Sequence, residues 1–146
     1  MSDSSRVSSA VTPTEAHEKM KNESFSYVDV RTEDEFAAGH PEGAFNIPIS
    51  HASASGMEPN PDFLAVMQKT FAKDAPIVVG CKMGGRSAKA QQALLAAGFT
   101  RVLDQSAGWD GKKGSFGELL EPGWSTSALP TETGHPAGRA YATLRS

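Results

Sequence analysis

The sequence predicts an α/β fold, with a mostly parallel sheet that carries helices on both faces. Short apolar runs alternate with longer stretches of helical spacing, a pattern that favours right-handed crossover connections between parallel strands. The run 77–80 is apolar throughout, as expected for a central strand whose two faces are both covered. The chain has 146 residues, no internal repeat and no sign of a second domain, so we expect one domain with a sizeable core.

Charge and composition narrow the classes of function. The formal net charge is −3, which argues against a broad nucleic-acid-binding surface. No apolar run reaches membrane-spanning length and the N-terminus lacks the apolar segment of a signal peptide, so we expect no membrane contact and a cytoplasmic protein. The Ser-rich first ten residues leave an organellar transit peptide open. The single cysteine cannot form an intramolecular disulfide and suits a reducing compartment.

Capping residues and apolar runs place the first strands and helices. Residues 1–9 are polar and are expected to be loose, although 6–8 could form a short first strand. The stretch 12–21 opens with a Thr, Pro and Glu that form a capping box, which predicts a helix. The apolar run 27–30 predicts a strand. A capping threonine, three acidic residues and a final glycine predict a short helix at 32–39.

The middle of the chain continues this alternation. Residues 44–47 are expected to form a strand that a proline ends, and the Ser-, Gly- and Pro-rich stretch 51–61 a loop. Apolar residues at helical spacing predict a helix at 62–71, before the central strand at 77–80. An alanine-rich helix should follow at 87–97 and end at the glycine behind it.

The last third of the chain is predicted to contain the last strand of the sheet, a return loop and a tail. Residues 101–104 should form the last strand. Residues 105–110 should form a loop that returns to the carboxyl ends of the strands, where ligand sites of such sheets gather. The stretch 111–124 is polar and glycine-rich and could contain a helical turn at 118–120, and 131–146 is expected to be a disordered tail. The folded domain is therefore expected to span 10–130.

The only cysteine, Cys81, lies in a short loop between the central strand and the helix that follows. Gly84 and Gly85 allow successive backbone N–H groups to turn inward and form an anion-binding nest, for which we expect unusual backbone angles at these glycines. The helix start adds unpaired N–H groups and the positive end of its dipole. A lone cysteine is ordinarily a small buried apolar residue. Lys82, the two glycines and Arg86 favour a thiolate nucleophile instead.

The pattern Cys-X-X-Gly-X-Arg-Ser behind a buried strand resembles the active-site loop of the rhodanese-type sulfurtransferases. Two further motifs occur in the family's order, and the resemblance extends over roughly residues 7–130. It implies a three-layer rhodanese-like fold, with a five-stranded sheet between layers of helices. The matching segments outside the loop are Val-Asp-Val-Arg-Thr at 28–32, Glu-Phe at 35–36, Gly-His at 39–40, Gly-Ala-Phe-Asn-Ile-Pro at 43–48, Ala-Gly-Phe at 97–99, Val-Leu at 102–103 and Gly-Trp at 108–109.

The resemblance implies an enzyme that transfers sulfur through a cysteine persulfide. The Cys81 thiolate would attack the outer sulfur of a small anionic donor such as thiosulfate. Cyanide or a thiol, which could belong to a protein, would then remove that sulfur. The backbone N–H groups of Met83, Gly84 and Gly85 would stabilise the anionic sulfur. No cofactor and no metal is expected.

The charged residues near the loop have alternative roles. Lys82 and Arg86 would favour an anionic donor, but Arg86 could instead be turned away and hold the loop through a salt bridge. Asp29 and Arg31 could be catalytic in principle. Structural support is favoured, because a carboxylate at a strand end can satisfy loop N–H groups and an arginine can pair with a nearby acid. His40 is expected to be a hydrogen-bonded turn residue rather than a base or a metal ligand.

Two other functions stay open at this point. Cysteine phosphatases separate Cys and Arg by five residues, whereas four residues separate Cys81 from Arg86 here. The tighter loop favours a sulfur-centred group over a phosphoryl group, so a phosphatase is the less favoured alternative. A rhodanese-like domain with an intact loop could also be a protein-bound persulfide carrier or a binding module with little turnover.

Overall fold

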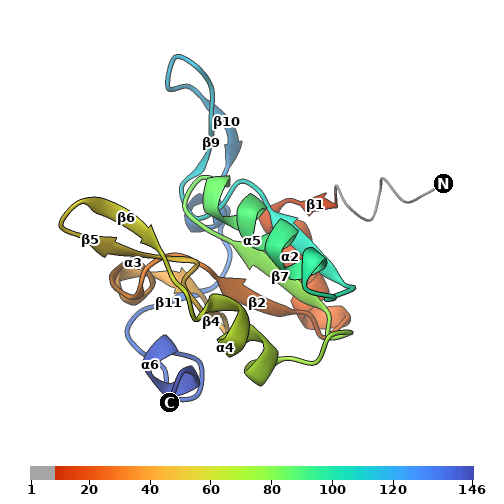
Figure 1. Ribbon diagram of the computed structural model, residues 1–146. Coiled ribbons are helices and arrows are strands. Elements are labelled where there is room, and N and C mark those ends of the chain that lie inside the picture. The colour runs from red at the N-terminus through yellow and green to blue at the C-terminus, as the bar shows by residue number, and fades with distance from the viewer. Residues whose placement is uncertain (1–8) are drawn as a thin grey trace.

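A five-stranded sheet forms the centre of the computed structural model, which describes residues 9–146 (Figure 1). The strand order is β1-β8-β7-β2-β4, and every neighbouring pair is parallel. All four residues of the central strand β7 are buried, as its apolar sequence predicts. The predicted α/β class and the five-stranded parallel sheet are therefore confirmed. The strands are β1 (Ala10–Val11), β2 (Ser26–Asp29), β4 (Phe45–Asn46), β7 (Ile77–Gly80) and β8 (Val102–Gln105).

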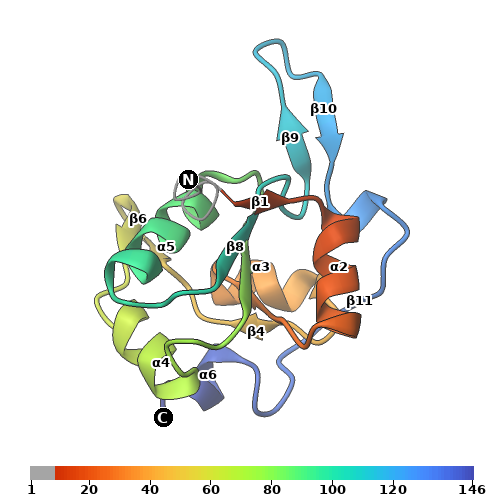
Figure 2. The same cartoon turned by 90° about the vertical axis from the view of Figure 1, so that its right-hand side faces the viewer.

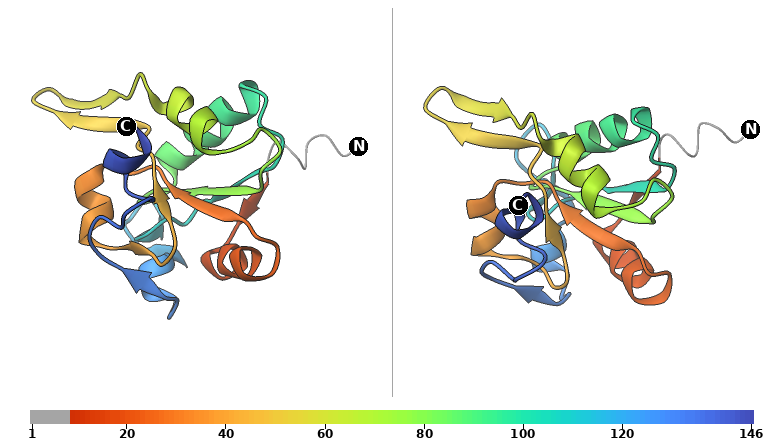
Figure 3. Two further views of the ribbon diagram at one scale, coloured as in Figure 1. Left: turned by 90° about the horizontal axis from the view of Figure 1, so that it is seen from below. Right: turned by 60° about the horizontal axis from the view of Figure 1, so that its bottom comes forward.

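Two pairs of helices cover opposite faces of this sheet (Figures 2 and 3). Side chains alternate in direction along a strand, so Val78 and Val79 of β7 enter different cores. Val79 packs with the apolar side chains of α4 and α5, whereas Val78 packs with those of α2 and α3. The helices are α2 (Pro13–Asn22), α3 (Glu33–Ala38), α4 (Phe63–Thr70) and α5 (Gly85–Ala96).

The predicted helix starts of α2 and α3 are confirmed by their capping boxes. The Thr12 hydroxyl accepts a hydrogen bond from the Glu15 N–H, and the Glu15 carboxylate accepts one from the Thr12 N–H. Thr32 and Glu35 form the same reciprocal pair at α3. Each box satisfies donors that a helix start leaves unpaired. The possible strand at 6–8, and nearly all of the loose N-terminus predicted for residues 1–9, lie outside the described residues.

Two antiparallel hairpins project from the body, where the sequence predicted a loop at 51–61 and a polar stretch at 111–124 (Figure 1). The helical turn considered for 118–120 was wrong, because residues 119–122 form a strand. One occupies most of the stretch 51–61 and pairs β5 (Ser50–Ser53) with β6 (Gly56–Pro59). The other pairs β9 (Gly111–Lys113) with β10 (Leu119–Pro122). Both hairpins are largely exposed, so their strands have no buried face and show no apolar alternation from which they could be predicted.

The stretch 131–146, expected to be a disordered tail, is packed against the domain. β11 (Thr131–Glu132) pairs with β3 (His40–Pro41), and after it come a loop and α6 (Tyr141–Leu144); a short 3-10 turn, η1 (Trp124–Thr126), precedes them. Tyr141 is buried in the same core as α4 and α5, and its hydroxyl accepts a hydrogen bond from Asn60 Nδ2. The polar composition of this segment predicted disorder. One buried tyrosine and a few side-chain hydrogen bonds are nevertheless enough to hold the segment in place.

Candidate active site

Cys81 directly follows β7, at the edge of the sheet where the carboxyl ends of all the parallel strands meet. The loop from Cys81 leads into α5, so the cysteine lies between a central strand and a helix N-terminus, as predicted. Its side chain is 3% exposed and lies in a pocket of about 360 Å³. The residues that line this pocket are Cys81, Lys82, Met83, Gly85, Arg86 and Lys89.

The Cys81 sulfur accepts hydrogen bonds from two backbone N–H groups, and its thiol donates one to the Ser87 hydroxyl oxygen. The N–H groups of Gly84 and Ser87 donate to Sγ at 3.1 and 3.3 Å, and the Ser87 hydroxyl lies 3.5 Å from it. Gly84 was predicted as a donor, but no hydrogen bond joins Sγ to Met83 or Gly85 among the described residues. Ser87 was missed, although it stands in the first turn of α5, where backbone N–H groups lack helical partners. Such donors favour negative charge on the sulfur.

The unusual backbone angles predicted for both glycines occur only at Gly84. Gly84 has φ +106°, the left-handed region, and caps the N-terminus of α5. A Cβ atom there would lie 2.5 Å from the carbonyl oxygen of Ser106. Gly85 is the first residue of α5, and a Cβ atom there would meet open space. The expectation for Gly85 was therefore wrong, because the chain completes its turn one residue before the helix begins.

Arg86 is engaged in a two-pronged ion pair with Glu35 of α3. Its Nη1 and Nη2 donate to Oε1 and Oε2 at 2.7 and 3.0 Å. Burial alone would raise the pKa of Glu35, but hydrogen bonds from Arg86 and Thr32 lower it to about 2. This is the salt-bridge geometry that the sequence left open for Arg86. The ion pair joins the start of α5 to α3, while the arginine still lines the pocket.

The side chains of Lys82 and Met83 are exposed at the pocket, whereas the backbone of this part of the loop is hydrogen-bonded to the return loop. Lys82 is half-exposed and lies 3.8 Å from Asp110, a long and solvated pair that leaves its charge accessible to an anion. Met83 is 51% exposed. The backbone beneath them is held by the return loop, because the N–H groups of Trp109 and Asp110 donate to the carbonyls of Cys81 and Lys82 at 2.8 and 2.9 Å.

Asp29 and Arg31 form a buried ion pair beside the loop and do not line the pocket. Arg31 Nε and Nη2 donate to the Asp29 carboxylate at 2.9 and 2.6 Å, and Nη2 also donates to the Gly39 carbonyl. The guanidinium lies 5.1 Å from the centre of the Trp109 ring. The pair therefore connects the end of β2, the end of α3 and the return loop. Contacts of this kind are those expected for structural support, which stays a prediction for both residues.

His40 is buried and lies away from the pocket. Its ring stacks on that of Phe36 with 3.6 Å between centroids, and Nδ1 lies 2.6 Å from the Phe36 carbonyl oxygen. Nε2 lies 3.1 Å from Glu132 of β11. His40 thus joins α3 to the C-terminal segment. Within residues 9–146, no group of three or more His, Cys, Asp or Glu side chains is placed to hold a metal ion.

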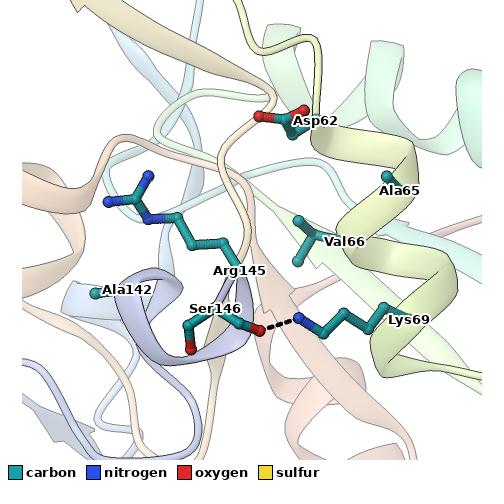
Figure 4. Close-up of a pocket in the computed structure, with 7 residues that line it drawn as sticks. All are labelled: Asp62, Ala65, Val66, Lys69, Ala142, Arg145 and Ser146. Atoms are coloured by element: carbon teal, nitrogen blue, oxygen red, sulfur yellow. Dashed lines mark hydrogen bonds between the residues drawn. The ribbon is translucent and has the colours of Figure 1, made fainter.

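Another hollow, of about 520 Å³, lies between α4 and α6 (Figure 4). Lys69 points across it and donates a hydrogen bond to the main-chain oxygen of Ser146. Asp62 and Arg145 also border it (Figure 4). It contains none of the site residues predicted from the sequence. The pocket at Cys81 is smaller, but the predicted cysteine, Lys82 and Arg86 all line it.

The family model described as "Rhodanese-like domain" matches residues 12–114 of the chain. This chain belongs to the rhodanese family. Its sequence is 42% identical over 132 residues to thiosulfate sulfurtransferase 16, chloroplastic, of Arabidopsis thaliana, covering 90% of this chain and 99% of the relative. It is 29% identical over 125 residues to thiosulfate sulfurtransferase GlpE of Glaesserella parasuis, covering 86% of this chain and 94% of the relative.

Solved structures show the same rhodanese-like architecture. The crystal structure of Rv0390 from M. tuberculosis matches with a TM-score of 0.71 and 26% identity, over 86% of this chain and 98% of that chain. The rhodanese match at 12–114 contains the Cys81 loop, its donors and the return loop. Strand β10 and the C-terminal segment lie beyond it.

Replacement of Gly84 tests the left-handed turn. We expect Gly84→Ala to lower the free energy of unfolding by about 1–3 kcal/mol, because alanine is strained at this φ and its Cβ would overlap the Ser106 carbonyl. Gly85→Ala is the matched control and should be neutral or stabilising by up to about 1 kcal/mol. Urea unfolding monitored by tryptophan fluorescence measures both. Equal destabilisation of the two variants would contradict the assignment of the turn to Gly84.

The ion pair between Glu35 and Arg86 should make stability depend on pH. The pKa of Glu35 is about 2 in the folded protein against an ordinary value of 4.5, so its stabilisation is fully present above pH 4.5 and is lost as the pH falls toward 2. Glu35→Gln should therefore be less stable than the parent by about 2 kcal/mol at pH 7. Urea unfolding at pH 7, 5, 4 and 3 should show this difference narrowing below pH 4.5. A difference that stays constant down to pH 3 would rule out the charged pair as its source.

Proposed function

We propose that the protein is a sulfurtransferase that carries a sulfane sulfur as a persulfide on Cys81. The Cys81 thiolate attacks the outer sulfur of thiosulfate or a similar donor, the sulfur–sulfur bond of the donor breaks, and sulfite leaves with its electron pair. A thiolate or cyanide acceptor then attacks the outer sulfur of the persulfide, and the Cys81 thiolate leaves. Together the two steps transfer one sulfur atom from the donor to the acceptor, and the second step regenerates the Cys81 thiolate.

The observation that carries this proposal is a buried Cys81 whose Sγ accepts hydrogen bonds from two backbone N–H groups, in a pocket that Lys82, Lys89 and Arg86 also line. The N–H groups of Gly84 and Ser87 favour negative charge on the sulfur before attack and after release. An N–H donor that is fixed by the backbone needs no rearrangement during the reaction. The site therefore requires no general base once Cys81 is ionised.

The charges around the pocket suit an anionic donor. Lys82 and Lys89 both line it, and Lys82 is held only loosely by Asp110. We assign the binding of the donor anion to these lysines, with Met83 and Gly85 as walls. Arg86 donates both Nη groups to Glu35, so we assign it chiefly to holding the loop while its charge adds to the positive potential.

The β9–β10 hairpin favours a second candidate function, in which a protein thiol is the acceptor and the protein acts as a persulfide carrier. Phe116 is 95% exposed, and Leu119 and Leu120 are more than half exposed. The hairpin continues directly from the return loop, whose Asp110 N–H is bonded to the Lys82 carbonyl. A small anion has no use for exposed apolar side chains at this place, whereas a docked protein could cover them.

The cellular compartment of the protein is also a proposal. Within the described residues, no helix is long and apolar enough to cross a membrane. We propose a cytoplasmic protein, and we keep an organelle as the alternative because the Arabidopsis relative is named chloroplastic. Either compartment would have to keep the Cys81 thiol reduced.

Mass spectrometry tests the covalent intermediate directly. Incubation with thiosulfate should add one sulfur atom, about 32 Da, to the peptide that contains Cys81, and cyanide should remove it. Cys81→Ser is the matched control and should carry no addition, because a serine hydroxyl is not ionised near neutral pH. Hydrolysis of an aryl phosphate without any added sulfur would replace this proposal with the phosphatase alternative. A correctly folded protein with neither activity would favour a binding module.

A hairpin variant separates the two acceptor classes. The triple change Phe116→Ser, Leu119→Ser and Leu120→Ser should leave transfer from thiosulfate to cyanide unchanged, because none of these side chains lines the pocket. Transfer to a folded protein dithiol, with reduced thioredoxin as the probe, should fall about ten-fold relative to dithiothreitol, since one or two apolar anchors contribute this much to docking. Equal rates for the variant and the parent with both dithiols would remove the hairpin from acceptor recognition.

A further inference from the structure

Gln105 is a buried amide beside the candidate site that the proposed reaction does not use. It ends β8, lies opposite Gly80 of β7, and begins the return loop. Its side chain is completely buried. A buried amide needs partners for its N–H groups and for its carbonyl oxygen, so the hydrogen bonds of Gln105 show which parts of the chain it holds together.

The Gln105 amide is hydrogen-bonded to the main chain of Gly108, in the middle of the return loop. Its Oε1 accepts a hydrogen bond from the Gly108 N–H at 2.9 Å, and its Nε2 donates to the Gly108 carbonyl oxygen at 3.1 Å. The same Nε2 donates to the Tyr27 hydroxyl oxygen at 3.1 Å. Tyr27 belongs to β2 and is buried in the core. Gln105 therefore connects the return loop to a fixed point of the sheet.

Gly108 is packed directly against the loop that carries the sulfur. It has φ +71°, and a Cβ atom there would lie 2.5 Å from the Lys82 carbonyl oxygen and 2.6 Å from that of Cys81. The N–H groups of the next two residues, Trp109 and Asp110, donate to the carbonyls of Cys81 and Lys82 at 2.8 and 2.9 Å. The position of Gly108 therefore determines how the main chain of Cys81 and Lys82 is held.

The return loop also contacts the turn that directs the two donors toward the sulfur. The Ser106 carbonyl oxygen would lie 2.5 Å from a Cβ atom at Gly84, so the loop and the turn are in close contact. The N–H groups of Gly84 and Ser87 reach Cys81 Sγ at 3.1 and 3.3 Å. Hydrogen bonds weaken steeply as their geometry departs from linear, so a displaced return loop would weaken both bonds.

We propose that Gln105 is a positioning residue that, through Gly108, holds the return loop against the Cys81 main chain and keeps the sulfur aligned with its two N–H donors. Without the Gln105 amide, the return loop moves and the donors no longer point at the sulfur. The Cys81 thiolate is then less well stabilised. The inference rests on the proposed role of Cys81 as the reacting sulfur, and it adds a residue that sets the reactivity of this sulfur.

Alkylation of Cys81 by iodoacetamide tests this inference without any sulfur transfer. Cys81 is the only cysteine, so the loss of free thiol reports on it alone. Gln105→Met nearly keeps the volume of the side chain but removes all three of its hydrogen bonds. The pH of half-maximal alkylation should rise by about 0.5, so that alkylation below this pH becomes about three-fold slower than in the parent. The plateau rate at high pH reports on access to the thiol, which separates a change of access from a change of ionisation.

Gln91→Met is the matched control for the loss of a buried amide. Gln91 lies in α5, and its Nε2 donates at 2.9 Å to the main-chain carbonyls of Ser9 and Val102, at the other end of β8. This variant should lose stability in urea unfolding but keep the alkylation profile of the parent. An equal shift of the profile in the two variants would overturn the inference, because the reactivity of Cys81 would then follow overall stability.

Hydrogen exchange of the Trp109 and Asp110 amides tests the path through the return loop. In Gln105→Met these two amides should exchange about five-fold faster than in Gln91→Met, because their bonds to the carbonyls of the Cys81 loop open more often. A shifted alkylation profile with equal exchange in the two variants would overturn this path. An unchanged alkylation profile in a folded Gln105→Met would overturn the inference itself.

Tyr27→Phe decides the matter if Gln105→Met does not fold. This change removes only the hydroxyl to which Gln105 Nε2 donates and leaves the ring in the core. The pH of half-maximal alkylation should rise by about 0.3, or two-fold in rate, and an unchanged profile would contradict the inference. A protein that forms no persulfide but shows these shifts keeps the inference and loses the sulfurtransferase proposal.

Discussion

The site around Cys81 depends on one left-handed turn at Gly84. This turn brings the Gly84 N–H to the sulfur and at the same time starts α5, so that the Ser87 N–H points to the same atom. The turn is pressed against the Ser106 carbonyl, which leaves no room for a side chain. A small backbone feature thus determines where the two N–H donors point, and it requires glycine at position 84.

Several charged residues of the sequence motifs form ion pairs that connect different strands, helices and loops. Glu35 caps α3 with Thr32 and also pairs with Arg86, so one carboxylate connects two helices and the loop. The Asp29–Arg31 pair does the same for the end of β2 and the return loop. Buried or half-buried ion pairs of this kind are specific in geometry. They hold the backbone N–H groups in position without contacting the pocket sulfur themselves.

Three segments differ most from what the sequence predicted: the two hairpins and the C-terminal segment. The β9–β10 hairpin extends the return loop outward and exposes Phe116, while the β5–β6 hairpin projects elsewhere from the body (Figure 1). The C-terminal segment closes the opposite side of the domain through β11 and the buried Tyr141. None of these segments has the apolar periodicity of a buried element, so local sequence alone could not predict their structure.

The sequence by itself determined the α/β class with a mostly parallel sheet, the central strand β7, the capped starts of α2 and α3, and Cys81 as the candidate nucleophile. Apolar runs, capping boxes and a strand–glycine–helix loop are local features, and local physics is enough to interpret them. Only the tertiary structure decided the strand order of the sheet, that Glu35 holds Arg86, and that the Ser87 N–H rather than that of Gly85 faces the sulfur. These contacts join residues from different strands and helices, and their geometry is set by how the helices pack on the sheet.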